Sequence, residues 1–200
     1  MAIETLFKGF PSEEDLLNII MHTSTTGWEG ELVEKDIETW LENFKGEVYD
    51  IKLERLLALW LLSHFTYYNE SEVKHLCRVL YKDLLHYILK ETTTPGSNIE
   101  DTLKLFFSKS NIISAEETSG SGGFIAYIFR QENQLPIKQL FNFSLENIGD
   151  KIENVIVIDD VTLTSGKDGQ MYNFWEKAKL KYPKKNFYLL TLVASESSCE

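Results

Sequence analysis

The sequence predicts an α/β protein in which an all-helical N-terminal region precedes a mostly parallel sheet. Three observations support this fold class. Apolar residues recur at helical spacing through the first half of the chain, whereas strand-like and helix-like segments alternate from Asn111 onward. The run Val155–Ile158 contains only apolar residues, which is typical of a central parallel strand that is covered on both faces.

The first 108 residues are expected to form helices throughout. Ser12 can cap the first helix with Asp15 three residues later, and Thr92–Asn98, which contains a Pro-Gly pair, interrupts the pattern before the last helix. After the helix that Ser12 caps, helical periodicity predicts Glu31–Phe44, Ile51–Phe65, Ser71–Lys90 and Ile99–Phe107. We therefore divide the chain into a helical region at 1–108 and an α/β core at 109–200.

The second half is expected to supply the sheet and the helices that cover it. The predicted strands are Asn111–Ala115, Pro136–Phe143, Val155–Ile158 and Phe187–Ala194, and the predicted helices are Phe124–Gln131 and Gly169–Lys181. Since the sequence ends soon after the last predicted strand, we expect the core to be incomplete at its C-terminal end.

Composition limits the classes of partner. The chain carries 20 basic and 31 acidic residues, a formal net charge of −11, so direct nucleic-acid binding is not expected, although a locally positive cleft stays open. No apolar stretch is long enough to span a bilayer and no leader-like segment opens the chain, so we expect a cytoplasmic protein without a membrane partner. Cys77 and Cys199, far apart in sequence, do not indicate a disulfide framework.

The sharpest functional signal follows the apolar strand. Asp159 and Asp160 stand where that strand is expected to end, and their carboxylates suit the hydroxyls of a vicinal diol or a divalent cation. The turn that follows offers backbone N–H groups and hydroxyls at the start of a helix, which suits a phosphate. It consists of Leu163, Thr164, Ser165, Gly166 and Lys167. A ligand with a ribose diol beside a phosphate would satisfy both parts.

This segment resembles the signature of type I phosphoribosyltransferases: an apolar strand, two acidic residues, a branched apolar residue and a Thr- and Gly-rich loop. The resemblance implies a Rossmann-like phosphoribosyltransferase core that binds phosphoribosyl pyrophosphate with Mg²⁺. It assigns Asp159 and Asp160, as catalytic residues, to the ribose 2- and 3-hydroxyls, and Thr162–Lys167 to the 5-phosphate. Ser165 and Lys167 stand where the family often has Gly and Thr, and both changes are compatible with a phosphate site.

A second loop lies where the resemblance places the pyrophosphate loop. Ser119, Gly120, Ser121 and Gly122 precede the helix that is expected to begin at Phe124. Glycine lets the backbone approach a pyrophosphate closely, and the helix start adds a favourable dipole. Taken alone, such a loop is more often a flexible turn, so its position before the acidic motif is what makes it a candidate for substrate binding.

The whole chain also resembles a bacterial family of phosphoribosyltransferase-like proteins that are associated with conflict and anti-phage systems. In that family a helical region precedes the domain, and Trp60–Phe65 and Glu72–Tyr81 look like parts of it. The resemblance implies a role in phage defence and a protein partner from such a system.

Three other interpretations compete with a phosphoribosyl site. A Walker B strand would need a P-loop, which Ser165–Asp168 does not form, because Val161 stands where the leading Gly belongs. A response-regulator pocket would place its acidic pair near the start of its domain. In a purely structural interpretation, Asp159 and Asp160 end a strand and Thr164 caps a helix.

Binding is better supported than catalysis. Stabilising a departing pyrophosphate requires cationic groups or Mg²⁺. In the interval Ser144–Glu153, where the family's transferases carry a mobile loop, Lys151 is the sole cation. The candidate cations are Arg130, Lys138, Lys151 and Lys167. Two functions stay open: a phosphoribosyltransferase, and a non-catalytic nucleotide or ribose-phosphate sensor or effector module that acts through a protein partner.

Overall fold

The computed structural model describes residues 9–94, 96–114, 121–136, 145, 148–162 and 170–195. The chain forms two compact units, Met1–Glu70 and Ser71–Glu200, and each is described by itself. Among the described residues, no helix is both long enough and apolar enough to cross a membrane.

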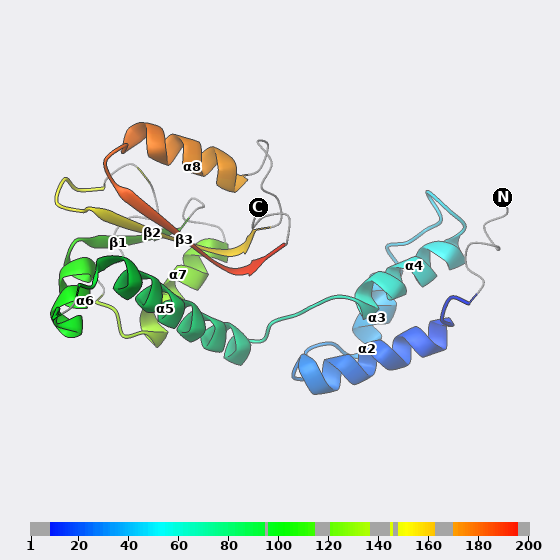
Figure 1. Cartoon of the computed structure of the whole chain (residues 1–200). Helices are drawn as coiled ribbons and strands as arrows, with labels where there is room; N and C mark the ends of the chain where they lie inside the picture. The colour runs from blue at the N-terminus through cyan, green and yellow to red at the C-terminus, as the bar shows by residue number, and fades with distance from the viewer. Residues whose placement is uncertain are drawn as a thin grey trace. The chain divides into compact units, whose positions relative to one another are not determined.

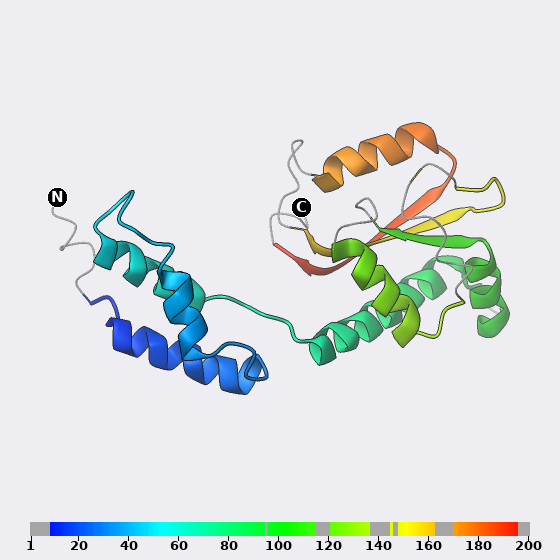
Figure 2. The ribbon, with the colours of Figure 1, turned by 180° about the vertical axis from the view of Figure 1, so that it is seen from behind.

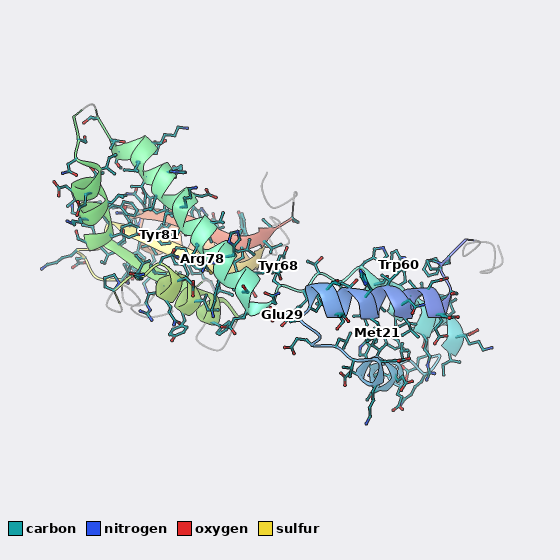
Figure 3. The ribbon with its side chains drawn as sticks, turned by 90° about the horizontal axis from the view of Figure 1, so that it is seen from below. Met21, Glu29, Trp60, Tyr68, Arg78 and Tyr81 are labelled. Carbon is teal, nitrogen blue, oxygen red and sulfur yellow. The ribbon has the colours of Figure 1, made fainter. Side chains whose placement is uncertain are left out.

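The first unit is helical, as predicted. It contains α2 (Glu13–Gly27), α3 (Glu34–Leu41) and α4 (Ile51–Ser63) (Figures 1 and 2). The predicted cap is confirmed, because the Ser12 hydroxyl accepts the N–H of Asp15 and the Asp15 carboxylate accepts the N–H of Ser12. The core of this unit consists of Leu16, Ile20, Trp28, Ile37, Leu41, Ala58 and Leu59. Met21 on α2 and Trp60 on α4 pack at its rim (Figure 3).

The second unit contains a parallel sheet of three strands in the order β1-β2-β3. The strands are β1 (Ser110–Ser114), β2 (Asn154–Thr162) and β3 (Asn186–Ala194). Ser114, the last residue of β1, is the register partner of Ile158, whereas β2 and β3 continue together to Thr162 and Ala194. The α/β fold class with a parallel sheet and a preceding helical region is therefore confirmed.

Helices cover both faces of this sheet (Figure 1). Because successive side chains of a strand point to opposite faces, Ile156 and Ile158 pack with α5 (Glu70–Thr92), α6 (Ile99–Ser108) and α7 (Ser121–Glu132). Val155 and Val157 pack on the other face with α8 (Gln170–Lys181). This double coverage is the reason why the strand between them is an uninterrupted apolar run.

α5 belongs to the core of the α/β unit. Its buried Cys77, Leu84 and Ile88 share one apolar cluster with the sheet, and Tyr81, labelled in Figure 3, contacts the rings of Phe107 and Phe129. The Arg78 guanidinium donates to the Glu132 carboxylate of α7 over 2.6 Å. The domain boundary at residue 108 stays a prediction, whereas the compact units divide between Glu70 and Ser71.

Several element ends differ from the predicted ones. α7 begins at Ser121 rather than Phe124, and β2 extends from Asn154 to Thr162 rather than ending at Ile158. β2 is longer because its pairing with β3 continues through Asp159, which faces Thr191 in the register. The strand predicted at Pro136–Phe143 lies, apart from its first residue, outside the described residues.

Candidate functional site

The candidate site lies at the carboxyl ends of β1 and β2, next to the first turn of α7. β1 ends at Ser114, which is 1% exposed, while β2 runs on through Asp159, which is 8% exposed. Ser114 and Asp159 are thus buried polar residues near the carboxyl ends of these two strands. Such burial is costly unless polar partners compensate it, so the two side chains are candidates for a functional or positioning role.

Gly122 brings the two strand ends together. A Cβ atom added to Gly122 would stand 2.9 Å from the Ser114 Oγ and 3.3 Å from the Asp159 Oδ1. The first turn of α7 therefore packs directly on both polar side chains, and only a residue without a side chain fits there without displacing them. Gly122 belongs to the helix rather than to the loop that was predicted before it.

Backbone N–H groups orient both carboxylates of the acidic pair. The N–H of Asp160 donates to the Asp159 Oδ1 over 3.1 Å, and the N–H of Val161 donates to the Asp160 Oδ1 over 2.8 Å. Asp159 is buried, whereas Asp160 is half-buried. The two oxygens of a carboxylate offer about four lone-pair positions, so one such bond does not by itself exhaust them.

Two threonines join the ends of β2 and β3 beside the acidic pair. The Thr162 hydroxyl donates to the Thr191 hydroxyl over 3.4 Å, and the Thr191 hydroxyl lies 2.9 Å from the carbonyl oxygen of Val193, to which it donates. Thr162 is the last residue of β2. The bond between the two hydroxyls links β2 to β3 beside the acidic pair.

The structure places some of the predicted site residues and not others. Asp159 and Gly122 lie side by side, Asp160 and Thr162 follow on β2, and Ser121 is the exposed first residue of α7. The other candidates lie outside the described residues, and their roles stay predictions: Ser119, Gly120, Leu163, Thr164, Ser165, Gly166 and Lys167.

Ser114 was not among the predicted site residues. A small polar residue at the end of the apolar run Ile112–Ile113 was the available signal, but it does not reveal that the first turn of α7 packs on it. Thr191 was missed because it is an unremarkable position within an apolar strand. Its proximity to Thr162 depends on the register of two strands that are far apart in sequence.

Two of the candidate cations lie away from this site. Arg130 is in the last turn of α7, about 13 Å along the helix from Ser121 at a rise of about 1.5 Å per residue. Lys151 precedes the start of β2, whereas the acidic pair is near the carboxyl end of that strand. Lys138 and Lys167 are outside the described residues.

A resident metal ion has no evident set of ligands in the described part of the chain. Among those residues, no three or more His, Cys, Asp or Glu side chains are grouped so as to hold a metal ion. Cys77 is not a ligand candidate: it is fully buried, and burial is the main reason that the pKa of its thiol is raised to about 11.

Comparison with known proteins identifies the family. No curated protein and no solved structure matches the chain. The model of one protein family, PRTase-CE, matches residues 37–200, which include the second half of the helical unit and all of the α/β unit. The match includes β1, the glycine-bearing first turn of α7 and the acidic pair on β2. The chain therefore belongs to the PRTase-CE family, a phosphoribosyltransferase-like family.

Proposed function

We propose that this chain binds phosphoribosyl pyrophosphate, or a related ribose phosphate, at the carboxyl ends of β1 and β2 and transfers its phosphoribosyl group. One observation carries the proposal: Gly122 lies against both Ser114 and Asp159. The two segments with the sequence features of a pyrophosphate site and a ribose site thus meet at one place in the fold. Membership of a phosphoribosyltransferase-like family supports this assignment.

The acidic pair is proposed to bind the ribose. The 2- and 3-hydroxyls of ribose are vicinal donors, and the carboxylates of Asp159 and Asp160 are adjacent acceptors that backbone N–H groups already orient. Charge-assisted hydrogen bonds of this kind are stronger than those between neutral groups. Because Asp159 is buried, its interaction with the sugar is weakly screened by solvent.

The phosphates are proposed to bind on either side of the ribose. The first turn of α7 offers N–H groups that have no partner within the helix, together with the positive end of the helix dipole. Ser121 has a small side chain and Gly122 has none, which leaves room for a pyrophosphate to approach that backbone. The assignment of the 5-phosphate to residues 163–167 rests on the sequence resemblance alone.

The chemistry would be a substitution at C1 of the ribose. An acceptor nucleophile forms a bond to C1 and loses a proton, while the bond between C1 and the pyrophosphate oxygen breaks and pyrophosphate leaves with the bonding electrons. Mg²⁺ would arrive bound to the pyrophosphate, as part of the substrate, and offset its charge. The protein's own contribution is to hold the ribose and both phosphate groups in place.

A sensor or effector without turnover is the second candidate. The positions of Arg130 and Lys151 favour it, because neither cation is placed to stabilise a departing pyrophosphate. In this alternative the same pocket binds a nucleotide or ribose phosphate, and occupancy changes the contact with a protein partner. The resemblance to conflict-associated proteins supports the proposal that either function serves phage defence.

Calorimetric titration with phosphoribosyl pyrophosphate, with and without Mg²⁺, tests the binding site. The wild type is expected to bind with Mg²⁺, and the double variant Asp159→Asn, Asp160→Asn is expected to lose binding. The variant Asp83→Asn, Asp150→Asn removes the same charge from two exposed positions and should bind like the wild type. Unchanged binding by the Asp159/Asp160 variant would refute both candidate functions.

Pyrophosphate release then separates the two functions. A transferase releases pyrophosphate when a suitable acceptor is supplied, whereas a sensor binds the ligand without consuming it. Phage plating on cells that carry the wild type or the Asp159/Asp160 variant tests the proposed defence role. Equal protection by the wild type and the variant would show that defence does not depend on the ribose-phosphate site.

A further inference from the structure

A second candidate site lies at the opposite end of the sheet. A hollow of about 470 Å³ opens beside the first residues of β3, where α5, α8 and the turn after α8 approach the strand. Its lining includes Tyr87, Trp175, Lys179, Tyr182, Lys185 and Tyr188. The proposed ribose-phosphate site is near the carboxyl ends of β1 and β2, so the two sites do not share residues.

Aromatic rings line the hollow from both faces of the sheet. On one face Tyr87 and Tyr188 stack edge to face, with ring centroids 6.1 Å apart. On the other face Trp175 and Phe187 do the same at 5.9 Å. Tyr87 remains 53% exposed. The hollow therefore presents flat apolar surface to solvent, which is the surface that a planar ring would cover.

Lysine side chains lie close to aromatic rings of the hollow. The Lys179 Nζ lies 5.0 Å from the centre of the Trp175 ring, and the Nζ atoms of Lys181 and Lys185 each lie 5.6 Å from the centre of the Tyr182 ring. Lys185 uses two of its three donors on the carbonyl oxygens of Gly149 and Ile152, which fixes its position.

The residues that line the hollow carry positive charge, whereas the chain has a formal net charge of −11. No acidic residue is among them, and the segment Lys177–Lys185 contains five lysines and no Asp or Glu. Glu91 lies behind this lining, close enough to Tyr188 to contribute, after burial and Tyr87, to the raised pKa of that tyrosine. Such segregation of positive charge attracts an anion locally despite the overall charge. An acidic peptide would match the lysines but would leave the exposed ring faces without a planar partner, whereas a nucleotide matches both.

We propose that the hollow binds a nucleotide, with its base against the exposed aromatic side chains and its phosphate at Lys179 and Lys185. Stacking on aromatic rings combined with cationic contacts to phosphate is the general basis of sequence-tolerant recognition of unpaired nucleotides. The shared chemistry is a base joined to a phosphate, and the source is either a free nucleotide or a nucleotide within a single strand.

The test measures binding of two probes to the full chain at low salt: AMP by calorimetry, and a short fluorescein-labelled oligothymidylate by anisotropy. The wild type is expected to bind at least one probe, and binding of the strand should weaken as salt rises. Binding of AMP alone identifies a free-nucleotide site, and binding of the strand alone identifies a single-strand site. Failure of both probes at millimolar nucleotide concentration overturns the proposal.

Variants assign the binding to this hollow. The double variant Trp175→Leu, Lys179→Gln should weaken binding about tenfold or more, given the strength of base stacking on aromatic rings. Lys179→Glu alone should weaken it too, which keeps the test valid if loss of Trp175 impairs folding. The control Tyr127→Leu, Lys82→Gln removes an exposed ring and an exposed lysine elsewhere and should leave binding unchanged.

The variant Asp159→Asn, Asp160→Asn distinguishes this site from the ribose-phosphate site. It should bind the oligothymidylate, which has no vicinal ribose diol, like the wild type, even where it no longer binds phosphoribosyl pyrophosphate. It should also keep the part of the AMP binding that Trp175→Leu, Lys179→Gln removes. Loss of probe binding in that variant, with retention in Trp175→Leu, Lys179→Gln, would assign the nucleotide to the other pocket and overturn the proposal. If the wild type does not bind phosphoribosyl pyrophosphate at all, the comparison of probe binding between the two double variants still tests the hollow.

Discussion

Gly122 and Asp159 are separated by 37 positions in the sequence, yet a Cβ atom on Gly122 would stand 3.3 Å from the Asp159 Oδ1. The contact fixes the first turn of α7 against the strand end that carries the acidic pair. Residue 122 must therefore lack a side chain if the Asp159 carboxylate is to keep its position. The proposed ligand site therefore depends on a glycine that need not touch the ligand at all.

Gly122→Ala is expected to impair ligand binding more than folding. Alanine favours the helix by about 1 kcal/mol over glycine, which partly offsets a steric cost of about 1–3 kcal/mol for the added methyl group. The Ser114 hydroxyl and the Asp159 carboxylate must shift to make room, so the affinity for phosphoribosyl pyrophosphate should fall. Urea denaturation and calorimetry on the same variant measure the two effects.

Gly149→Ala is the matched control, because an added Cβ at Gly149 meets no atom within 4 Å. It should leave both stability and affinity close to those of the wild type. Equal affinity of Gly122→Ala and the wild type would show that the packing of α7 on Asp159 does not shape the site.

Sequence patterns predicted the elements better than their ends. The five helices of the first half were expected near the places where they occur, because the period of apolar residues is a local property. The end of β2 was not predicted, because pairing with β3 holds the four residues from Asp159 to Thr162 in the strand. Pairing between strands that are distant in sequence leaves little trace in the residues themselves.

In the candidate site too, local sequence features could be predicted and contacts between distant residues could not. Asp159 and Asp160 are recognisable because two carboxylates after a buried strand are chemically unusual. Ser114 is not, since its significance comes from the approach of Gly122. The remoteness of Arg130 was not predicted either, because it follows from the start of α7 at Ser121, nine positions before Arg130 along the helix.

Cys77 is expected to report the unfolding of the α/β unit. The thiol is fully buried, and its pKa of about 11 keeps it protonated at pH values where an unfolded cysteine, with its usual pKa of 9.0, begins to ionise. In a Cys199→Ser background, Ellman's reagent at pH 8 should modify Cys77 slowly in the native protein and rapidly in denaturant. Fast labelling of the native chain would contradict the packing of α5.

The same shift predicts the direction of a pH effect. Below the usual thiol pKa both states are protonated, so the thiol does not change the stability. As the pH rises from about 9 towards 11, the unfolded state ionises first and the folded state loses stability. Cys77→Ala should remove this part of the alkaline sensitivity, and denaturation midpoints between pH 8 and pH 11 measure it.

Glu54 is expected to hold the segment before α4 in place. Its carboxylate accepts the N–H groups of Gly46, Val48 and Tyr49 over 2.6, 2.6 and 3.0 Å, and these bonds lower the pKa of the side chain. The lowered pKa means that the stabilisation is present at neutral pH and is lost as the pH falls below the usual carboxyl range. Glu54→Gln should therefore lower the thermal midpoint of the helical unit at pH 7.

The difference between Glu54→Gln and the wild type should shrink in acid, because the wild-type carboxyl is then neutral as well. Glu38→Gln, at an exposed position on α3, serves as the control and should show little effect at either pH. A constant difference at all pH values would mean that charge on Glu54 is not what holds the segment.

The packing of α5 and α6 on the sheet predicts that a chain beginning at Ser71 folds, whereas a chain beginning at Lys109 does not. The shorter chain loses Leu84, Ile88 and Phe106 from the apolar cluster that includes Ile156 and Ile158. Each such side chain contributes about 2 kcal/mol on burial, and the three together approach the total stability of an ordinary domain, about 5–15 kcal/mol. Urea denaturation followed by circular dichroism should show a cooperative transition for the longer chain alone. If the chain from Lys109 unfolds cooperatively at the same midpoint, the domain begins after residue 108, and α5 and α6 merely cover a sheet that is stable without them.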